Sequence, residues 1–126
     1  MMKLNHECVR DLMLAIESVE IVEPFLLTYF YEDQESLKIY TLDELFYTTL
    51  VLEGAGFLNA EDRSHGSGPE AIIRTITWEG HQFLDNIRDD GVWKDTKAVV
   101  SKLSSVSLGV VSDVASKIIA ELIKRN

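Results

Sequence analysis

A capped helix that is followed directly by a β-hairpin constrains the fold of this chain more than any other feature. Thr41 and Glu44 have the spacing of a capping box, in which the two residues satisfy each other's backbone amides at a helix N-terminus. Gly54 and Gly56 are placed to end that helix. The hairpin is predicted from three segments, a short strand, a nine-residue loop and a strand rich in isoleucine and threonine, at residues 57–60, 61–69 and 71–77.

Helices are predicted on both sides of this pair. Asn5 has the position of an N-cap, and apolar residues then recur with helical spacing over residues 8–19. Thr77 is expected to cap a further helix, which Gly91 would end. Apolar spacing predicts two more helices, over residues 92–103 and after Ser105.

This order of elements indicates an α+β fold that is mainly α with a small β-hairpin. It is typical of a winged helix-turn-helix core with two additional C-terminal helices. We expect residues 1–90 to form the winged-helix-like core, and residues 91–126 to form a helical extension packed on the same single domain. Residues 25–31 are rich in aromatic side chains and alternate poorly, so a short strand and a buried loop remain alternatives there.

Composition predicts one soluble domain. The chain has 126 residues, of which 46% are hydrophobic and 26% charged, so its core needs no disulfide or metal. Cys8 is the single cysteine, which excludes an internal disulfide and fits a reducing cytoplasm. The first residues turn polar at once, unlike a signal peptide. Because Asp113 and Lys117 interrupt the most apolar stretch, residues 106–123, we expect no membrane span and a cytoplasmic location.

Two stretches resemble a known family of small bacterial and phage proteins. They are residues 2–12, with MKLN followed by CVRDL, and residues 76–88, with ITWEGHQFLDNIR and a Val-Trp pair just beyond. The family is catalogued as domain of unknown function 2513, and the resemblance extends from residue 2 to about residue 120. It implies a protein similar to winged-helix proteins, often encoded in prophages, with transcriptional regulation as its expected role. A tyrosine-histidine pair is common in the family before the hairpin, and Tyr47-Thr48 stands there in this chain. The resemblance implies no catalytic residues.

The charge pattern disfavours binding of duplex DNA by the helix before the hairpin. Duplex binding depends on lysine and arginine side chains that neutralise phosphates. The predicted outward face of that helix has two acids and no base, whereas its apolar arc is expected to be buried; the outward residues are Asp43, Glu44, Tyr47, Thr48 and Val51, and the buried ones Leu42, Leu45, Phe46, Thr49, Leu50 and Leu52. Residues 1–90 hold 18 acidic and 6 basic residues, but residues 91–126 hold 3 and 6. If DNA is bound, the contacts are expected from Tyr47, Thr48, Arg63, Lys94, Lys97 and Lys102, with a dimer presenting the three lysines.

No motif predicts catalysis or a bound cofactor. His6 and Cys8 lie on one short segment and cannot chelate a metal together, so Cys8 is expected in the core. The Gly-Ser-Gly segment at residues 66–68 lacks the lysine of a phosphate-binding loop. No nucleophile, base and orienting group occur together. We therefore expect no enzyme, metal, cofactor or small-molecule substrate. Three large aromatic residues are predicted to pack in the core: Trp78, Phe83 and Trp93.

The last predicted helix has more apolar side chains than a one-sided surface helix needs. Such a surplus indicates either burial within the chain or contact with a helix of a partner. A homo-oligomer or partner interface is predicted there on Val111, Val114, Ala115, Ile118 and Leu122. Two functions follow as hypotheses. The first is a non-enzymatic winged-helix accessory that binds DNA or regulates transcription, and the second is a protein-interaction module whose scaffold has lost DNA binding.

Overall fold

The N-terminal helix begins at its predicted cap. A computed structural model describes residues 3–19 and 23–125. In it, Asn5 Oδ1 accepts hydrogen bonds from the backbone amides of Glu7 and Cys8, at 3.0 and 3.3 Å, so that α1 (His6–Glu17) follows directly. The helix buries the apolar face that its spacing predicts, and it contacts α3 and β3. The buried side chains of this face form part of the hydrophobic core.

The aromatic segment before residue 34 forms a short strand and then a short helix. Strand β1 (Phe25–Leu26) is followed without a loop by α2 (Leu27–Asp33) and by the 3₁₀ turn η1 (Glu35–Leu37). The sequence left a short strand and a buried loop as alternatives for residues 25–31. The strand is correct, but only for Phe25 and Leu26. The helix after it was not predicted. Because only Leu27 and Phe30 are buried in it, seven residues give too little periodicity to reveal a helix.

Helix α3 (Leu42–Gly54) begins and ends as predicted. Thr41 Oγ1 accepts a hydrogen bond from the amide of Glu44 at 3.1 Å. The Glu44 carboxylate does not complete the capping box and instead accepts a hydrogen bond from Asn5 Nδ2 at 3.3 Å, which links α3 to the start of α1. At the other end, Gly56 has a φ of 84°, and the amides of Gly56 and Phe57 donate to the carbonyls of Glu53 and Leu52. This is a Schellman ending, in which glycine tolerates the left-handed conformation.

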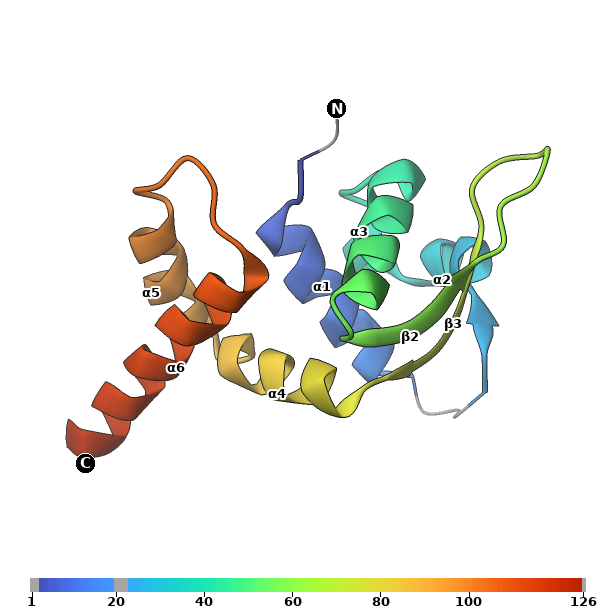
Figure 1. Ribbon diagram of the computed structural model, residues 1–126. Coiled ribbons are helices and arrows are strands. Elements are labelled where there is room, and N and C mark those ends of the chain that lie inside the picture. Colours follow the sequence, from blue (N-terminus) through green and yellow to red (C-terminus); the bar gives the residue numbers. More distant parts are fainter. Residues whose placement is uncertain (1–2, 20–22, 126) are drawn as a thin grey trace. The chain divides into compact units, whose positions relative to one another are not determined.

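The sheet has three antiparallel strands in the order β1-β3-β2 (Figure 1). The predicted hairpin is confirmed as β2 (Leu58–Asp62) and β3 (Ala71–Ile76), and its connecting loop extends beyond the sheet. The register shifts between Asn59 and Ala60, so one additional residue of β3 bulges there. Strand β3 is central, because β1 pairs with its other edge.

The first part of the chain, up to His81, has its own core. Its fully buried large side chains come from α1, α2, η1, α3 and β3, and are Val9, Leu12, Met13, Leu27, Leu37, Leu45, Leu52 and Ile73. Buried apolar surface of this kind is the dominant favourable term in folding. This core joins α1, α2, η1 and α3 to the central strand β3.

Three helices follow the hairpin. Helix α4 (Trp78–Ile87) has the predicted cap, because Thr77 Oγ1 accepts from the amide of Gly80 at 3.0 Å. The prediction that Gly91 ends this helix is wrong. Asp89 caps a new helix by accepting from Val92 N at 2.9 Å, and Gly91 lies in the first turn of α5 (Asp90–Val100). Helix α6 (Leu108–Arg125) completes the chain and packs against α5.

The chain divides into two units inside α4, between His81 and Gln82. The first contains the sheet with α1, α2, η1 and α3, and the second contains α5 and α6. The expected boundary after residue 90 stays a prediction. The α+β class is confirmed, since the described residues form a mainly helical structure with one small antiparallel sheet. Within the described ranges, no helix combines the length and the hydrophobicity that a membrane span requires.

Candidate interaction surfaces

Helix α3 is the element that a winged-helix protein would place in the DNA major groove, and its accessible side has no cation. Residues 42–54 include no lysine and no arginine. Asp43 and Glu53 are exposed. Between them lie half-buried side chains, most of them apolar or aromatic: Glu44, Phe46, Tyr47, Leu50 and Val51. The accessible face of α3 is therefore apolar with acidic residues around it.

Thr48 does not belong to this face, which corrects the sequence-based prediction. It is 1% exposed; its hydroxyl donates to the carbonyl of Glu44 at 2.8 Å and lies 3.5 Å from the Sγ of Cys8. A threonine in a helix can satisfy its hydroxyl on the preceding turn, so it can be buried at little cost. The predicted burial is wrong for three residues of the same helix, which are only half-buried: Leu42, Phe46 and Leu50.

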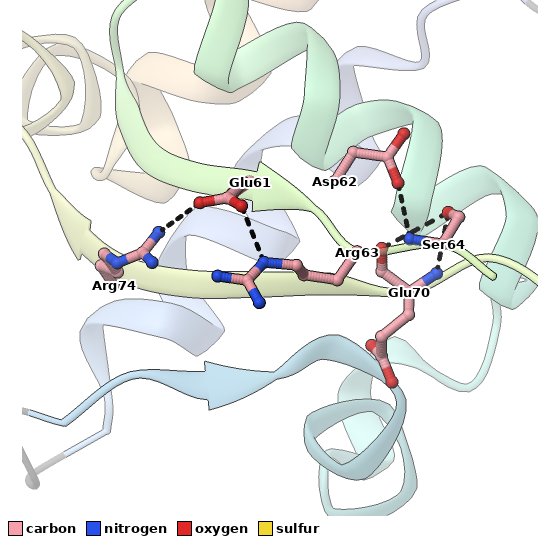
Figure 2. Close-up of polar contacts among 6 residues, drawn as sticks. All are labelled: Glu61, Asp62, Arg63, Ser64, Glu70 and Arg74. Atoms are coloured by element: carbon pink, nitrogen blue, oxygen red, sulfur yellow. Dashed lines mark hydrogen bonds and ion pairs between the residues drawn. The ribbon is translucent and has the colours of Figure 1, made fainter.

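The arginines of the hairpin are paired with a carboxylate. Figure 2 shows Glu61 between two of them: its Oε2 lies 2.7 Å from Arg63 Nε, and its Oε1 lies 3.4 Å from Arg74 Nη1. Arg63 is about half exposed, so the pair is a surface contact of modest energy. A phosphate would nevertheless have to compete with Glu61 for the guanidinium group. This pairing makes the guanidinium group of Arg63 less available to a DNA phosphate.

Local hydrogen bonds order the tip of the hairpin. Asp62 Oδ1 accepts from the amide of Ser64 at 2.8 Å (Figure 2). Hydrogen bonding by the side chain and then by the backbone of Ser64 lowers the pKa of Asp62. His65 Nδ1 lies 2.6 Å from Ser67 Oγ in the same loop. The loop thus presents an acidic side chain beside its one arginine.

The three predicted lysines lie in the second unit, whereas Tyr47 and Arg63 lie in the first. All three are exposed. Lys94 and Lys97 are three residues apart on α5 and therefore share a face, and Lys102 lies just after that helix. The Lys97 ammonium lies 5.9 Å from the ring centre of Trp93. The assignment of these lysines to DNA stays a prediction.

The apolar residues of α6 fall into two sets. Val111 and Ala115 are 1% and 0% exposed, so they belong to the core and not to an outer interface, which corrects their predicted position. A helix stripe that is wide enough to cover two directions can bury one side and expose the other. Val114, Ile118 and Leu122 occupy the second side. There they line a groove of about 430 Å³ together with Asp95, Val99, Lys117, Glu121 and Arg125.

Sequence reasoning missed several members of these surfaces. Val99 belongs to the apolar spacing that predicts the helix over residues 92–103, and the structure places it in the groove, 46% exposed. Lys117 and Glu121 are opposite charges four residues apart beside the apolar row, and this spacing could have indicated an interface rim. Trp78 was predicted in the core but is 73% exposed, whereas Phe83 and Trp93 are buried as predicted. Trp78 is the first residue of α4, and a large ring at such a position can remain exposed. The local sequence does not show whether it is exposed or buried.

The side chains weighed as metal or catalytic candidates do not come together. In residues 3–19 and 23–125, no three side chains of histidine, cysteine, aspartate or glutamate are arranged to hold a metal ion. Cys8 is fully buried, as predicted. Burial raises the pKa of its thiol to about 11, which keeps the sulfur protonated at neutral pH.

Comparison with known proteins agrees with the resemblance carried by residues 2–12 and 76–88. The model of a family described as "Hypothetical protein (DUF2513)" matches residues 3–107. An uncharacterized protein of Haemophilus influenzae (strain Rd) is 32% identical over 123 residues, which cover 97% of this chain and 99% of that relative. No solved structure matches the chain. With more than half of its length matched, the chain belongs to the DUF2513 family of hypothetical proteins.

Proposed function

We propose that this chain is a non-catalytic winged-helix interaction module, which binds a basic protein surface through α3 and the hairpin in place of duplex DNA. The order of elements supports the winged-helix part of the proposal. Two helices, α2 and α3, precede the hairpin, and the short strand β1 joins the sheet beside β3. In a winged helix, such a hairpin lies next to the helix that makes the main contacts.

The accessible face of α3 carries the proposal. A duplex-binding helix needs cations for phosphates and donors such as arginine or asparagine for base edges. Helix α3 offers neither, because its accessible residues are Asp43, Glu44 and Glu53 around Phe46, Tyr47, Leu50 and Val51. Aromatic and apolar side chains surrounded by acids match a protein surface that has apolar positions among lysines and arginines.

The hairpin supports the same partner. Glu61 pairs with Arg63 and Arg74, and Asp62 is an exposed carboxylate that accepts a hydrogen bond from the amide of Ser64. Helix α3 contacts β2, the strand that ends with Glu61 and Asp62. Close to a phosphate backbone, the Asp62 carboxylate would be repelled, since charges within a Debye length of about 8 Å interact strongly. Close to a cationic protein, it would be attracted.

A DNA-binding accessory of the regulatory type remains the second candidate function, because of the lysines in the other unit. Lys94, Lys97 and Lys102 are exposed, and residues 91–126 have twice as many basic as acidic residues. Duplex DNA could contact these side chains without any contribution from α3. The two candidate functions therefore predict that different residues are required for any binding of DNA.

Fluorescence anisotropy with a labelled random duplex tests the proposal. We expect no binding by the wild-type chain at about 50 mM salt, where phosphate contacts are strongest, and none at about 200 mM. Micromolar binding that is lost in the Tyr47→Ala variant would overturn the proposal. Binding that survives Tyr47→Ala but is lost in the triple variant Lys94→Ala, Lys97→Ala, Lys102→Ala would instead support the second candidate.

A further inference from the structure

The groove on the second unit has a row of apolar side chains with charged side chains beside it. The pattern of these charges indicates what binds in the groove. Its floor is formed by Val99 of α5 and by Val114, Ile118 and Leu122 of α6. The three α6 residues are four apart and therefore lie in one row along the helix. Leu122 is 43% exposed and Val99 46% exposed, so the floor remains accessible in this unit. Asp95, Lys117, Glu121 and Arg125 form the rim.

The rim charges are self-complementary under a two-fold axis. Lys117 and Glu121 lie on the same flank of the apolar row, one helical turn apart. When two copies of α6 lie antiparallel with the axis level with residue 119, each Lys117 meets the Glu121 of the other copy. A two-fold axis keeps the same flank of both helices together, so this contact occurs twice. Neither a small apolar ligand nor an entirely basic partner would match both signs of charge.

The existing contact of Glu121 does not prevent this pairing. Its Oε1 lies 4.0 Å from Lys124 Nζ, and both side chains are more than half exposed. An exposed pair at this distance is weak and mobile, so Glu121 can also reach a cation across an interface. We propose that α6 pairs antiparallel with α6 of a second copy through this groove, so that the chain is a two-fold symmetric dimer. This inference goes beyond the proposed function and uses a different surface.

Charge exchange between copies tests the dimer and its register. Lys117→Glu leaves only acids at the two rim positions, and Glu121→Lys leaves only bases. We expect the wild type to be dimeric at micromolar concentration by sedimentation equilibrium, and each single variant to dimerise about tenfold more weakly. Mixing the two variants should produce a heterodimer with near wild-type affinity, because opposite charges then meet again. Restoration by mixing separates this interaction from any effect within one helix.

An apolar pair of variants tests the floor of the groove. Ile118→Asp should abolish dimerisation, whereas Ile123→Asp should leave it unchanged, because Ile123 is 69% exposed and does not line the groove. Circular dichroism checks that both variants retain their helices. If Ile118→Asp fails to fold, the charge variants still decide the question.

A wild-type chain that remains monomeric throughout the micromolar range would overturn the dimer, as would undiminished dimerisation of Ile118→Asp. A dimer that is disrupted by Ile118→Asp, but in which the two charge variants show no preference for each other, would overturn the antiparallel register. Failure here would leave the α3 proposal intact, since DNA binding and α3 contacts are measured separately.

Discussion

Tyr40 and Asp11 make a short hydrogen bond in the first unit. The phenol Oη donates to Asp11 Oδ2 at 2.6 Å, and the tyrosine is buried while the carboxylate is only half-buried. Burial, together with the hydrogen bond to Asp11, raises the pKa of Tyr40 above its ordinary value of 10.0. A charged acceptor makes this bond stronger than one between neutral groups.

Removal of this bond has a predictable pH signature. Tyr40→Phe should lower the free energy of unfolding by roughly 1–2 kcal/mol at neutral pH, because a hydrogen bond to a carboxylate is lost. The folded chain holds the phenol proton more tightly than the unfolded chain does. The contribution of Tyr40 to stability is therefore fully present below about pH 10 and is lost as the pH rises further.

Urea unfolding at pH 7 and near pH 10.5, in wild type and Tyr40→Phe, measures both effects. The variant should show a smaller loss between the two pH values than the wild type shows. An equal loss in both proteins would mean that Tyr40 does not contribute to alkaline destabilisation. An unchanged stability at pH 7 would contradict a structural role for the bond.

At the scale of elements, the start of α4 depends on a close approach to the segment between α3 and β2. The amide of Thr77 donates to the carbonyl of Phe57 at 3.1 Å, and Gly80 is buried against the same carbonyl. A Cβ atom on Gly80 would overlap the Phe57 oxygen and come within 2.8 Å of Ile76 Cγ2. Glycine is therefore required in this tryptophan-glycine segment for packing, not for an unusual φ.

Gly80→Ala should consequently destabilise the first unit by about 2 kcal/mol or more, since the backbone must shift to admit the methyl group. Gly54→Ala is the matched control: Gly54 also lies in a helix, no atom would contact its Cβ within 4 Å, and alanine favours the helix. Thermal unfolding of the two variants compares them directly. If Gly80→Ala melts at or above the temperature of Gly54→Ala, the close approach does not constrain α4.

The elements that could be predicted from the sequence are those with local signals. Asn5, Thr41 and Thr77 cap helices through amides two or three residues away, and Gly56 ends α3 within the same turn. Helix α2 has no such signal. Its first turn is held by Glu70, whose carboxylate accepts from the amide and hydroxyl of Thr28 at 3.2 and 2.5 Å. A partner 42 residues away cannot be identified from local spacing.

At the scale of the whole molecule, the candidate surfaces could be predicted less well than the fold. The absence of cations in α3 is a property of composition and could be predicted without a structure. Which side of α3 is accessible could not, because tertiary packing buries Thr48 and leaves Phe46 and Leu50 half-buried. The same limit applies to α6, where Val111 is buried and Val114 lines the groove. Both are valines of one helix, so only tertiary packing distinguishes them.

The two proposals concern different units. In the first unit the α3 face is proposed to bind a basic protein, and in the second unit α6 is proposed to pair with another copy of the chain. Neither role needs catalysis, and each depends on a surface that can be altered without touching the other. The α3 proposal is the more consequential of the two, because a protein contact there would take the place of the DNA contact that a winged helix makes.

Photo-cross-linking from α3 in the native host tests this claim most directly. A benzophenone amino acid placed at Tyr47 reports which class of molecule contacts the face, and the same amino acid at Ile39, which is 78% exposed in the same unit, gives the background. We expect a discrete protein adduct from position 47 that is absent from position 39 and is diminished by Asp43→Lys. Adducts with nucleic acid from position 47, or none above the background at position 39, would contradict it.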